Sequence, residues 1–218
     1  MNRPEDVYMP TSTGLQDRQD IADLMTGWIH RDQGRWDRLR ELFHPDARIE
    51  ITWFEGPASD FVDASAGMAT TDLRTKHLIT APFVTFSADG NRAVSETNAV
   101  IVAENGSLHL GCNGHNRFID RLERRDGVWR IADRKSVYDF AGFTFPAGIP
   151  EIDVEVVARY PREYGALAYL LDRSGFPVRR VFATKGSDLE RDVLETAFAW
   201  LGEAGMTKHV PTAHDARK

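Results

Sequence analysis

Three tight turns, each built on Asp-Gly or Asn-Gly, most constrain what this chain can fold into. They lie at Asp89-Gly90, Asn105-Gly106 and Asp126-Gly127, and each separates two segments in which apolar and polar residues alternate. An Asn-Gly or Asp-Gly pair between alternating segments is the strongest short-range signal for a β-hairpin. We therefore predict an antiparallel meander of four long strands, over residues 75–87, 91–104, 107–124 and 128–140.

The segment before the meander has the periodicity of helices. Residues 15–31 place apolar side chains at spacings of three and four, which predicts a helix that buries one face: Ile21, Leu24, Met25, Trp28 and Ile29. A second helix is predicted over 35–43, a strand over 48–54 and a short helix over 60–68. Helices followed by a curved antiparallel sheet predict an α+β fold. The helices would pack on one face of the sheet, and a pocket would open at the mouth of the cone.

The composition changes after residue 140. Residues 141–150 are rich in glycine and proline, and helices are predicted over 164–174 and 187–202. In the second of these, Ser187 and Glu190 have the spacing of a capping box. We therefore expect a loose N-terminal segment over 1–14, a domain over 15–141 and an extension over 142–218. One or two helices belong to this extension, and residues 209–218 are expected to be frayed.

Composition and charge argue against several classes of protein. The 218 residues carry a net charge of −6, and lysine and arginine do not gather into a basic stripe, so no nucleic-acid partner is expected. A run of about 18 apolar residues is missing and the first residues lack the apolar core of a signal peptide, so we expect a cytoplasmic protein without a membrane span. The single cysteine, Cys112, excludes an intrachain disulfide. A metal site among the histidines is less favoured than none, because their spacing does not match a ligand pattern.

Three residues from separate elements are candidates for a proton-transfer site. Asp32 follows Trp28 by four residues, so its carboxylate projects from the buried side of the first helix and needs a partner there. His77 lies on the first long strand and Arg134 on the last. In such a site the aspartate orients the imidazole, the histidine accepts a proton and the arginine stabilises negative charge. Taken singly, each also has an ordinary structural explanation: a helix cap, a core histidine or a surface ion pair.

Aromatic side chains on the same elements are expected to line the pocket. Alternation places Ser136 and Tyr138 on the strand face of Arg134, and Phe83 on the face of His77. For His115 the pattern allows either the pocket or solvent. The predicted lining residues are Trp28, Trp53, Phe54, Phe83, His115, Phe118, Tyr138 and Phe140.

Three motifs resemble the SnoaL-like domains of the NTF2-like superfamily. They are the opening run IADLMTGWIHRDQGRWDRLRELFHPDARIEI, the strand TKHLIT and the ending NRFIDRLERRDGVWRIADRKSVYDF. They follow one another in the family's order over residues 15–141. The resemblance implies a cone-shaped α+β fold and the chemistry of scytalone dehydratase, hexachlorocyclohexane dehydrochlorinase, ketosteroid isomerase and the polyketide cyclases. These relatives act without cofactors on apolar cyclic substrates.

The resemblance also implies roles for particular residues. Asp32 and His77 fall where the dehydratase and dehydrochlorinase branch has its catalytic dyad, and Arg134 falls where the dehydrochlorinase has a catalytic arginine. The extension is similar to tails of longer members, among them lyases that release formaldehyde from lignin-derived diaryl compounds. The leading hypothesis is thus a cofactor-independent lyase acting on a small apolar substrate, which is expected to be aromatic. The chain would form a homo-oligomer, a trimer rather than a dimer, and the extension would wrap a neighbour or close the pocket mouth.

Two other functions remain open from the sequence. A binding protein without chemistry would hold the carboxylate of Asp32 and the imidazole of His77 more than about 4 Å apart. A hydrolase that opens epoxides would need two carboxylates and an arginine around a water molecule, and Asp32, Asp120 and Arg134 could supply them. In that case the imidazole of His77 would point away from the cavity.

Overall fold

The computed structural model describes residues 14–203. Its centre is a curved sheet of seven strands in the order β2-β1-β7-β6-β5-β3, with β4 paired to β5. The strands are β1 (Phe43–Ile51), β2 (Phe54–Pro57), β3 (Leu73–Ile79), β4 (Phe83–Phe86), β5 (Arg92–Asn105), β6 (Leu110–Arg125) and β7 (Val128–Thr144). The predicted meander is confirmed, because β3, β5, β6 and β7 pair in sequence and antiparallel. β1 joins the far edge of the meander by pairing parallel to β7.

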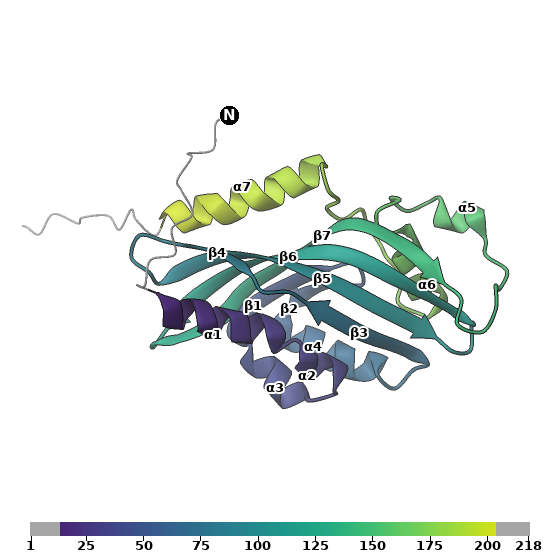
Figure 1. The fold of residues 1–218 in the computed structure, drawn as a ribbon, viewed down its shortest axis with the longest axis horizontal. Helices are drawn as coiled ribbons and strands as arrows, with labels where there is room; N and C mark the ends of the chain where they lie inside the picture. The colour runs from purple at the N-terminus through teal and green to yellow at the C-terminus, as the bar shows by residue number, and fades with distance from the viewer. Residues whose placement is uncertain (1–13, 204–218) are drawn as a thin grey trace, which may run out of the picture.

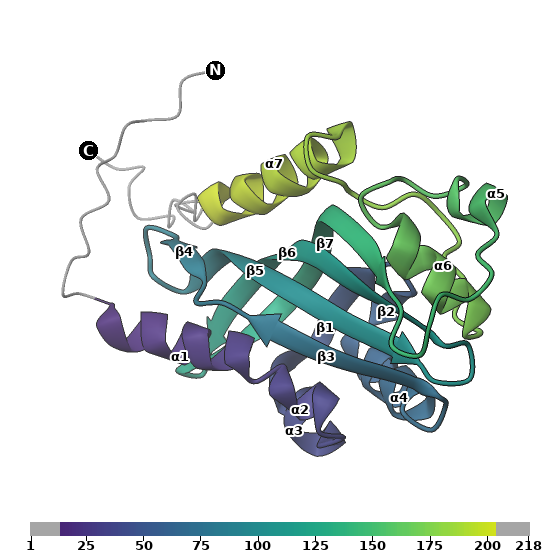
Figure 2. The same ribbon diagram turned by 45° about the vertical axis from the view of Figure 1, so that its right-hand side comes forward.

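Helices cover both faces of this sheet. They are α1 (Leu15–Thr26), α2 (Ile29–Asp32), α3 (Trp36–Glu41), α4 (Ala58–Met68), α5 (Val154–Val157), α6 (Gly165–Arg173) and α7 (Asp188–Glu203). α1 to α4 lie on one face and α7 lies across the opposite face, while α5 and α6 lie at one end (Figures 1 and 2). The predicted α+β cone with helices on its concave face is therefore confirmed. The convex face is covered in part by the chain's own last helix.

The predicted single helix over 15–31 is wrong, because the chain turns between α1 and α2 at Gly27 and Trp28. The turn brings Gly27 so close to the end of α3 that an added Cβ would lie 2.7 Å from Cδ2 of Leu42. A larger residue could not pack there without displacing its neighbour. The break changes the direction of the chain before the short helix α2. As a result α2 places Arg31 and Asp32 toward the sheet, and Trp28 is buried.

The predicted first long strand is also wrong as a single strand. It divides into β3 and β4, and residues 80–82 between them lie outside both strands. Pro82 cannot donate a backbone hydrogen bond to a neighbouring strand, which ends regular pairing there. The interruption also changes which side chains face inward: Val84 is buried, whereas Phe83 is 56% exposed.

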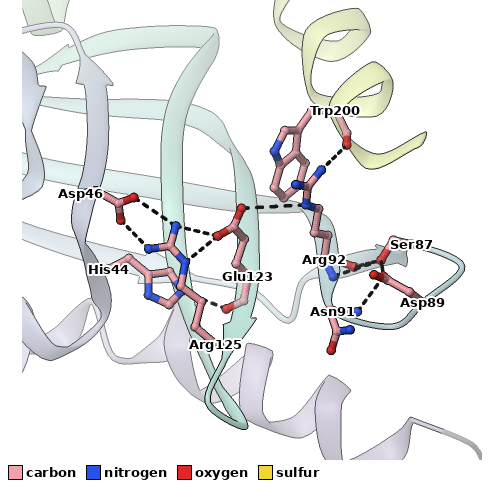
Figure 3. Close-up of polar contacts among 9 residues, drawn as sticks. All are labelled: His44, Asp46, Ser87, Asp89, Asn91, Arg92, Glu123, Arg125 and Trp200. Atoms are coloured by element: carbon pink, nitrogen blue, oxygen red, sulfur yellow. Dashed lines mark hydrogen bonds and ion pairs between the residues drawn. The ribbon is translucent and has the colours of Figure 1, made fainter. Parts of the chain in front are cut away.

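α7 begins with a capped first turn and is held to the convex face by apolar packing and by ion pairs. The predicted N-cap is confirmed, since Ser187 Oγ accepts a hydrogen bond from the Glu190 backbone N–H at 3.1 Å. Near the other end of α7, the Arg92 guanidinium donates to the Trp200 carbonyl at 3.2 Å and contacts Glu123 at 3.9 Å (Figure 3). Glu123 in turn pairs with Arg125 at 2.6 Å. The network continues to Asp46 on β1, so it joins β1, β5, β6 and α7.

The part of the chain predicted as an extension packs on the sheet. β7 continues to Thr144, past the predicted domain end at residue 141. α6 buries Leu167, Leu170 and Leu171 against the strands. Within the described helices, none is long and apolar enough to cross a membrane. The residues expected to be frayed, 209–218, lie outside the described range.

Candidate active site

A narrow cavity lies between the concave face of the sheet, α2, α4 and α6. Its polar wall comes from Arg31, Thr52, Thr75, His77, Asn116, Ser136 and Tyr138. Its apolar wall comes from Trp28, Ile51, Trp53, Met68, Ile101, Ala103, Phe118, Leu167 and Leu171. The cavity has a volume of about 40 Å³, which is room for about three water molecules.

Asp32 and His77 form a hydrogen-bonded pair at the cavity. Oδ1 of Asp32 lies 2.7 Å from Nδ1 of His77, and Oδ2 accepts the backbone N–H of His77 at 2.7 Å. Both carboxylate oxygens are therefore committed to one residue, and both side chains are almost fully buried. Because the carboxylate accepts from Nδ1–H, the neutral imidazole keeps its lone pair on Nε2. Nε2 makes no hydrogen bond within residues 14–203, so it is the ring nitrogen available to a ligand in the cavity.

The surroundings keep the imidazole neutral and the carboxylate ionised. Burial is the largest cause that lowers the pKa of His77 below 6.5, and the nearby positive charges of Arg31 and Arg134 act in the same direction. The hydrogen bond to Asp32 opposes this shift without reversing it. For Asp32, burial works to raise the pKa, but the hydrogen bonds and charge of His77 together lower it below 3.8. The pair at neutral pH is thus a carboxylate beside a neutral imidazole, the protonation state that a general base needs.

Arg31 is a cavity residue that the sequence did not single out. Its side chain is 6% exposed, and Nη1 donates to Oγ1 of Thr75 at 2.7 Å. Nη2 lies 3.4 Å from the sulfur of Met68. Burial lowers the pKa of Arg31 to about 10, against the charge of Asp32, which raises it. A helical arginine usually faces solvent, and only its position three residues after Trp28 could have indicated the buried face.

The structure does not bring Arg134 to the cavity wall. Its guanidinium is fully buried in a two-point ion pair with Asp120, with N–O distances of 2.7 and 2.8 Å. The guanidinium carbon lies 4.5 Å from the ring centroid of Trp28 and 4.2 Å from that of Phe118. These two rings stand between Arg134 and the cavity that they line. Arg134 therefore acts on the site through its charge and through the placement of the rings.

Four of the predicted aromatic lining residues reach the cavity, and Tyr138 is the most constrained of them. Its hydroxyl accepts the Thr52 backbone N–H at 3.0 Å and donates to Thr52 Oγ1 at 3.3 Å. Burial raises the pKa of Tyr138 above 10. The hydroxyl is thus neutral at physiological pH and already hydrogen-bonded. The other three are Trp28, Trp53 and Phe118.

Four predicted lining residues lie elsewhere, and β-sheet geometry explains three of them. Phe83 is turned outward by the break between β3 and β4. In β7 the register shifts, since Tyr138 pairs with Asn116 but Phe140 pairs with His115. This bulge turns Phe140 to the convex face. His115 lies on that face by regular alternation with Asn116, which lines the cavity, and the two rings stack with centroids 4.1 Å apart. Phe54 lines a wider groove next to the cavity.

That wider groove shares Thr52, Trp53 and Met68 with the cavity. Its outer wall comes from the segment after α6, including Phe176. The Trp53 and Met68 side chains therefore separate a narrow inner space from a wide outer one. Methionine has a flexible, unbranched side chain, so Met68 can move aside at small energetic cost.

Within the described residues, we find no group of three or more histidine, cysteine, aspartate or glutamate side chains that could hold a metal ion.

A model of the SnoaL-like domain matches residues 13–135, more than half of the chain. The chain belongs to the SnoaL-like domain family. The matched range carries α1 to α4 and both members of the Asp32–His77 pair. The predicted family membership is thereby confirmed.

Relatives of this SnoaL-like protein agree on the fold. Pea pathogenicity protein 2 of Fusarium vanettenii is 28% identical over 208 residues, which cover 88% of each chain. The crystal structure of a hexachlorocyclohexane dehydrochlorinase from Novosphingobium barchaimii has a TM-score of 0.51, with 21% identity over 64% of this chain and 96% of that one. A candidate scytalone dehydratase from Novosphingobium aromaticivorans has a TM-score of 0.53, with 17% identity over 63% and 97%. The shared architecture is the NTF2-like cone.

Proposed function

We propose that this protein is a cofactor-independent lyase that removes a proton from a small, mainly apolar, aromatic substrate and expels a leaving group. The proposal is carried by one observation, the 2.7 Å contact between Nδ1 of His77 and the carboxylate of Asp32 at the cavity wall. In the proposed reaction Nε2 of His77 takes the proton, Asp32 holds the tautomer and supports the imidazolium, and the leaving group departs by elimination or by retro-aldol loss of formaldehyde. Dehydrochlorinase and dehydratase structures with the same fold support this class of reaction.

The alternatives derived from the sequence have less support. A binding protein without chemistry was expected to separate Asp32 from His77 by more than about 4 Å, and their side chains are in hydrogen-bond contact. A hydrolase of the epoxide-opening type was expected to turn His77 away and to use Asp120. His77 lines the cavity, whereas Asp120 is fully buried and paired with Arg134. Arg134 is better placed to tune the proposed base than to touch a substrate.

Substrate entry is proposed to occur from the wide groove. The inner space holds only about three water molecules, so an aromatic ring needs room that the Trp53 and Met68 side chains now occupy. Displacing them toward the groove would join the two spaces. Leu167 and Leu171 of α6 would then close the cavity behind the substrate, in line with the expected role of the extension at the pocket mouth.

The test is a pH profile on a panel of aromatic substrates that contain a β-leaving group or a β-hydroxymethyl group. With an active substrate, kcat/KM is expected to be flat from pH 7 to 8.5 and to fall as the pH drops below 6.5. The sign follows because protonation of Nε2 removes the base and the pKa of His77 is lowered. The control is His115→Ala, which changes a histidine on the convex face and should keep the profile. A profile that survives unchanged in His77→Ala would refute the proposal.

We further propose that the chain forms a homo-oligomer, with a trimer favoured over a dimer, through the convex face of the sheet. A row of side chains crosses this face in register, from Leu78 through Val100 and His115 to Phe140. Leu78 is 57% exposed and Phe140 is 59% exposed. An exposed apolar row of this kind is typical of a surface that a partner covers.

Sedimentation of the Phe140→Glu variant tests this assembly. The variant should sediment as a monomer at concentrations where the wild-type protein sediments as an oligomer, because a carboxylate would be buried without a partner. Phe145→Glu is the control, since Phe145 is exposed but lies outside the row. A wild-type protein that stays monomeric at tens of micromolar would exclude the proposed interface.

A further inference from the structure

Arg31 is a buried cation whose hydrogen-bonding capacity is poorly used. A guanidinium has five N–H donors. The contacts of Arg31 within residues 14–203 are one hydrogen bond to the neutral hydroxyl of Thr75 and one contact to the sulfur of Met68. Its nearest carboxylate oxygen, on Asp32, lies 3.8 Å away, beyond hydrogen-bond distance. Both oxygens of Asp32 are instead directed at His77.

The other buried arginine of the concave face is ion-paired, although its Nη1 makes no hydrogen bond within the described residues. Arg134 has a carboxylate partner of its own, Asp120, which accepts from two of its nitrogens. Arg31 has no such partner, although it is also buried, and the shift of its pKa to about 10 has desolvation as its main cause. Buried charges are ordinarily paired or hydrogen-bonded. The spare donors of Arg31, which lines the cavity, are therefore available to a partner that enters it.

The position of Arg31 defines where that partner would lie. Arg31 lines the same cavity as His77 and stands beside it, between Thr75 and Met68. Its guanidinium carbon is 5.9 Å from the ring centroid of Trp53, one of the two side chains that separate cavity and groove. A ligand that entered from the groove would thus meet Arg31 as it came within reach of the proposed base.

We propose that Arg31 binds a carboxylate group of the substrate and so restricts the proposed reaction to aromatic or unsaturated acids. Arginine binds carboxylates with two parallel N–H···O bonds, a geometry that fixes orientation as well as position. The anchored carboxylate would direct the carbon acid of the same molecule toward Nε2 of His77. That the bound acid is a substrate rests on the proposed lyase function. Carboxylate binding by Arg31 does not depend on that function.

The experiment measures binding without turnover. Benzoate and acetate, with benzamide and acetamide as uncharged analogues, are titrated at pH 8 while the indole N–H signals of Trp28 and Trp53 are followed by NMR. At this pH His77 is neutral, because its pKa is lowered, and Arg31 is still charged. Any preference for the anions then comes from the arginines near the cavity, and the variants assign it among them. The wild-type protein should prefer each carboxylate over its amide by about 10-fold or more.

Variants assign the preference to one residue. Arg31→Met should weaken carboxylate binding by about 10-fold to 100-fold and leave amide binding nearly unchanged, and Arg31→Lys should keep part of the preference. Arg74→Met is the matched control, since Arg74 is exposed, lines only the outer cleft behind Arg31 and carries the same charge. Wild-type protein that binds neither carboxylate, or amides equally well, overturns the proposal. If carboxylates bind through Arg31 but His77→Ala does not alter turnover, only the proposed function fails.

Discussion

Replacing Asp120 with alanine is expected to lower the free energy of unfolding by about 3–5 kcal/mol. The Arg134 guanidinium that Asp120 binds is 0% exposed, so the variant would leave a cation buried against Trp28 and Phe118 without its counter-charge. Its remaining partner would be the sulfur of Met25 at 3.1 Å, which is a weak acceptor. Urea unfolding followed by circular dichroism measures the loss.

Two comparisons separate this effect from a general cost of changing an aspartate. Asp46→Ala removes the same kind of ion pair on the surface, where Asp46 meets Arg125, and should cost at most about 1 kcal/mol. The double variant Asp120→Leu with Arg134→Met should recover much of the stability, because breaking a buried pair costs more than replacing it with apolar side chains. A loss below about 1 kcal/mol in Asp120→Ala would show that water reaches Arg134 and that the pair is not truly buried.

The sequence predicted the sheet better than the site, for physical reasons. Turns such as Asp126-Gly127 are local, because a residue pair with suitable backbone preferences specifies a hairpin almost alone. The Asp32–His77 contact joins residues 45 positions apart. Periodicity made the two residues candidates but left each with an ordinary explanation, and the family motifs then indicated that they form a pair.

The wrong predictions follow from breaks and bulges in the strands, which a pattern of alternating apolar and polar residues does not reveal. One extra residue in β7 turns Phe140 away from the face of Tyr138, and the break before β4 does the same to Phe83. Arg31 was missed because an arginine on a short helix is usually exposed. Leu167 and Leu171 of α6 reach the cavity because the extension folds back onto the sheet. The local sequence does not indicate where the extension will pack. Residue identity predicts a face only while the strand or helix remains regular.

Asp32→Asn is expected to lower kcat/KM by about 10² to 10⁴ while leaving the fold intact. The amide oxygen can still accept the His77 backbone N–H, a bond that is 2.7 Å long in the wild-type protein. The amide nitrogen would then face Nδ1 and donate to it, so the neutral imidazole must carry its proton on Nε2. The base would be present but in the wrong tautomer, with its lone pair turned away from the cavity.

This variant distinguishes a catalytic dyad from a structural hydrogen bond. Nitrogen-15 NMR of the imidazole should report a proton on Nδ1 in the wild-type protein and on Nε2 in Asp32→Asn, with thermal unfolding changed little. If the pair were only structural, Asp32→Asn would lower the stability of the protein. Its turnover would then fall only in proportion to the loss of folded protein. Asp133→Asn is the control, because Asp133 is a half-buried carboxylate that pairs with Arg121 outside the cavity. Normal turnover by Asp32→Asn with the Nε2–H tautomer established would mean that His77 is not the base.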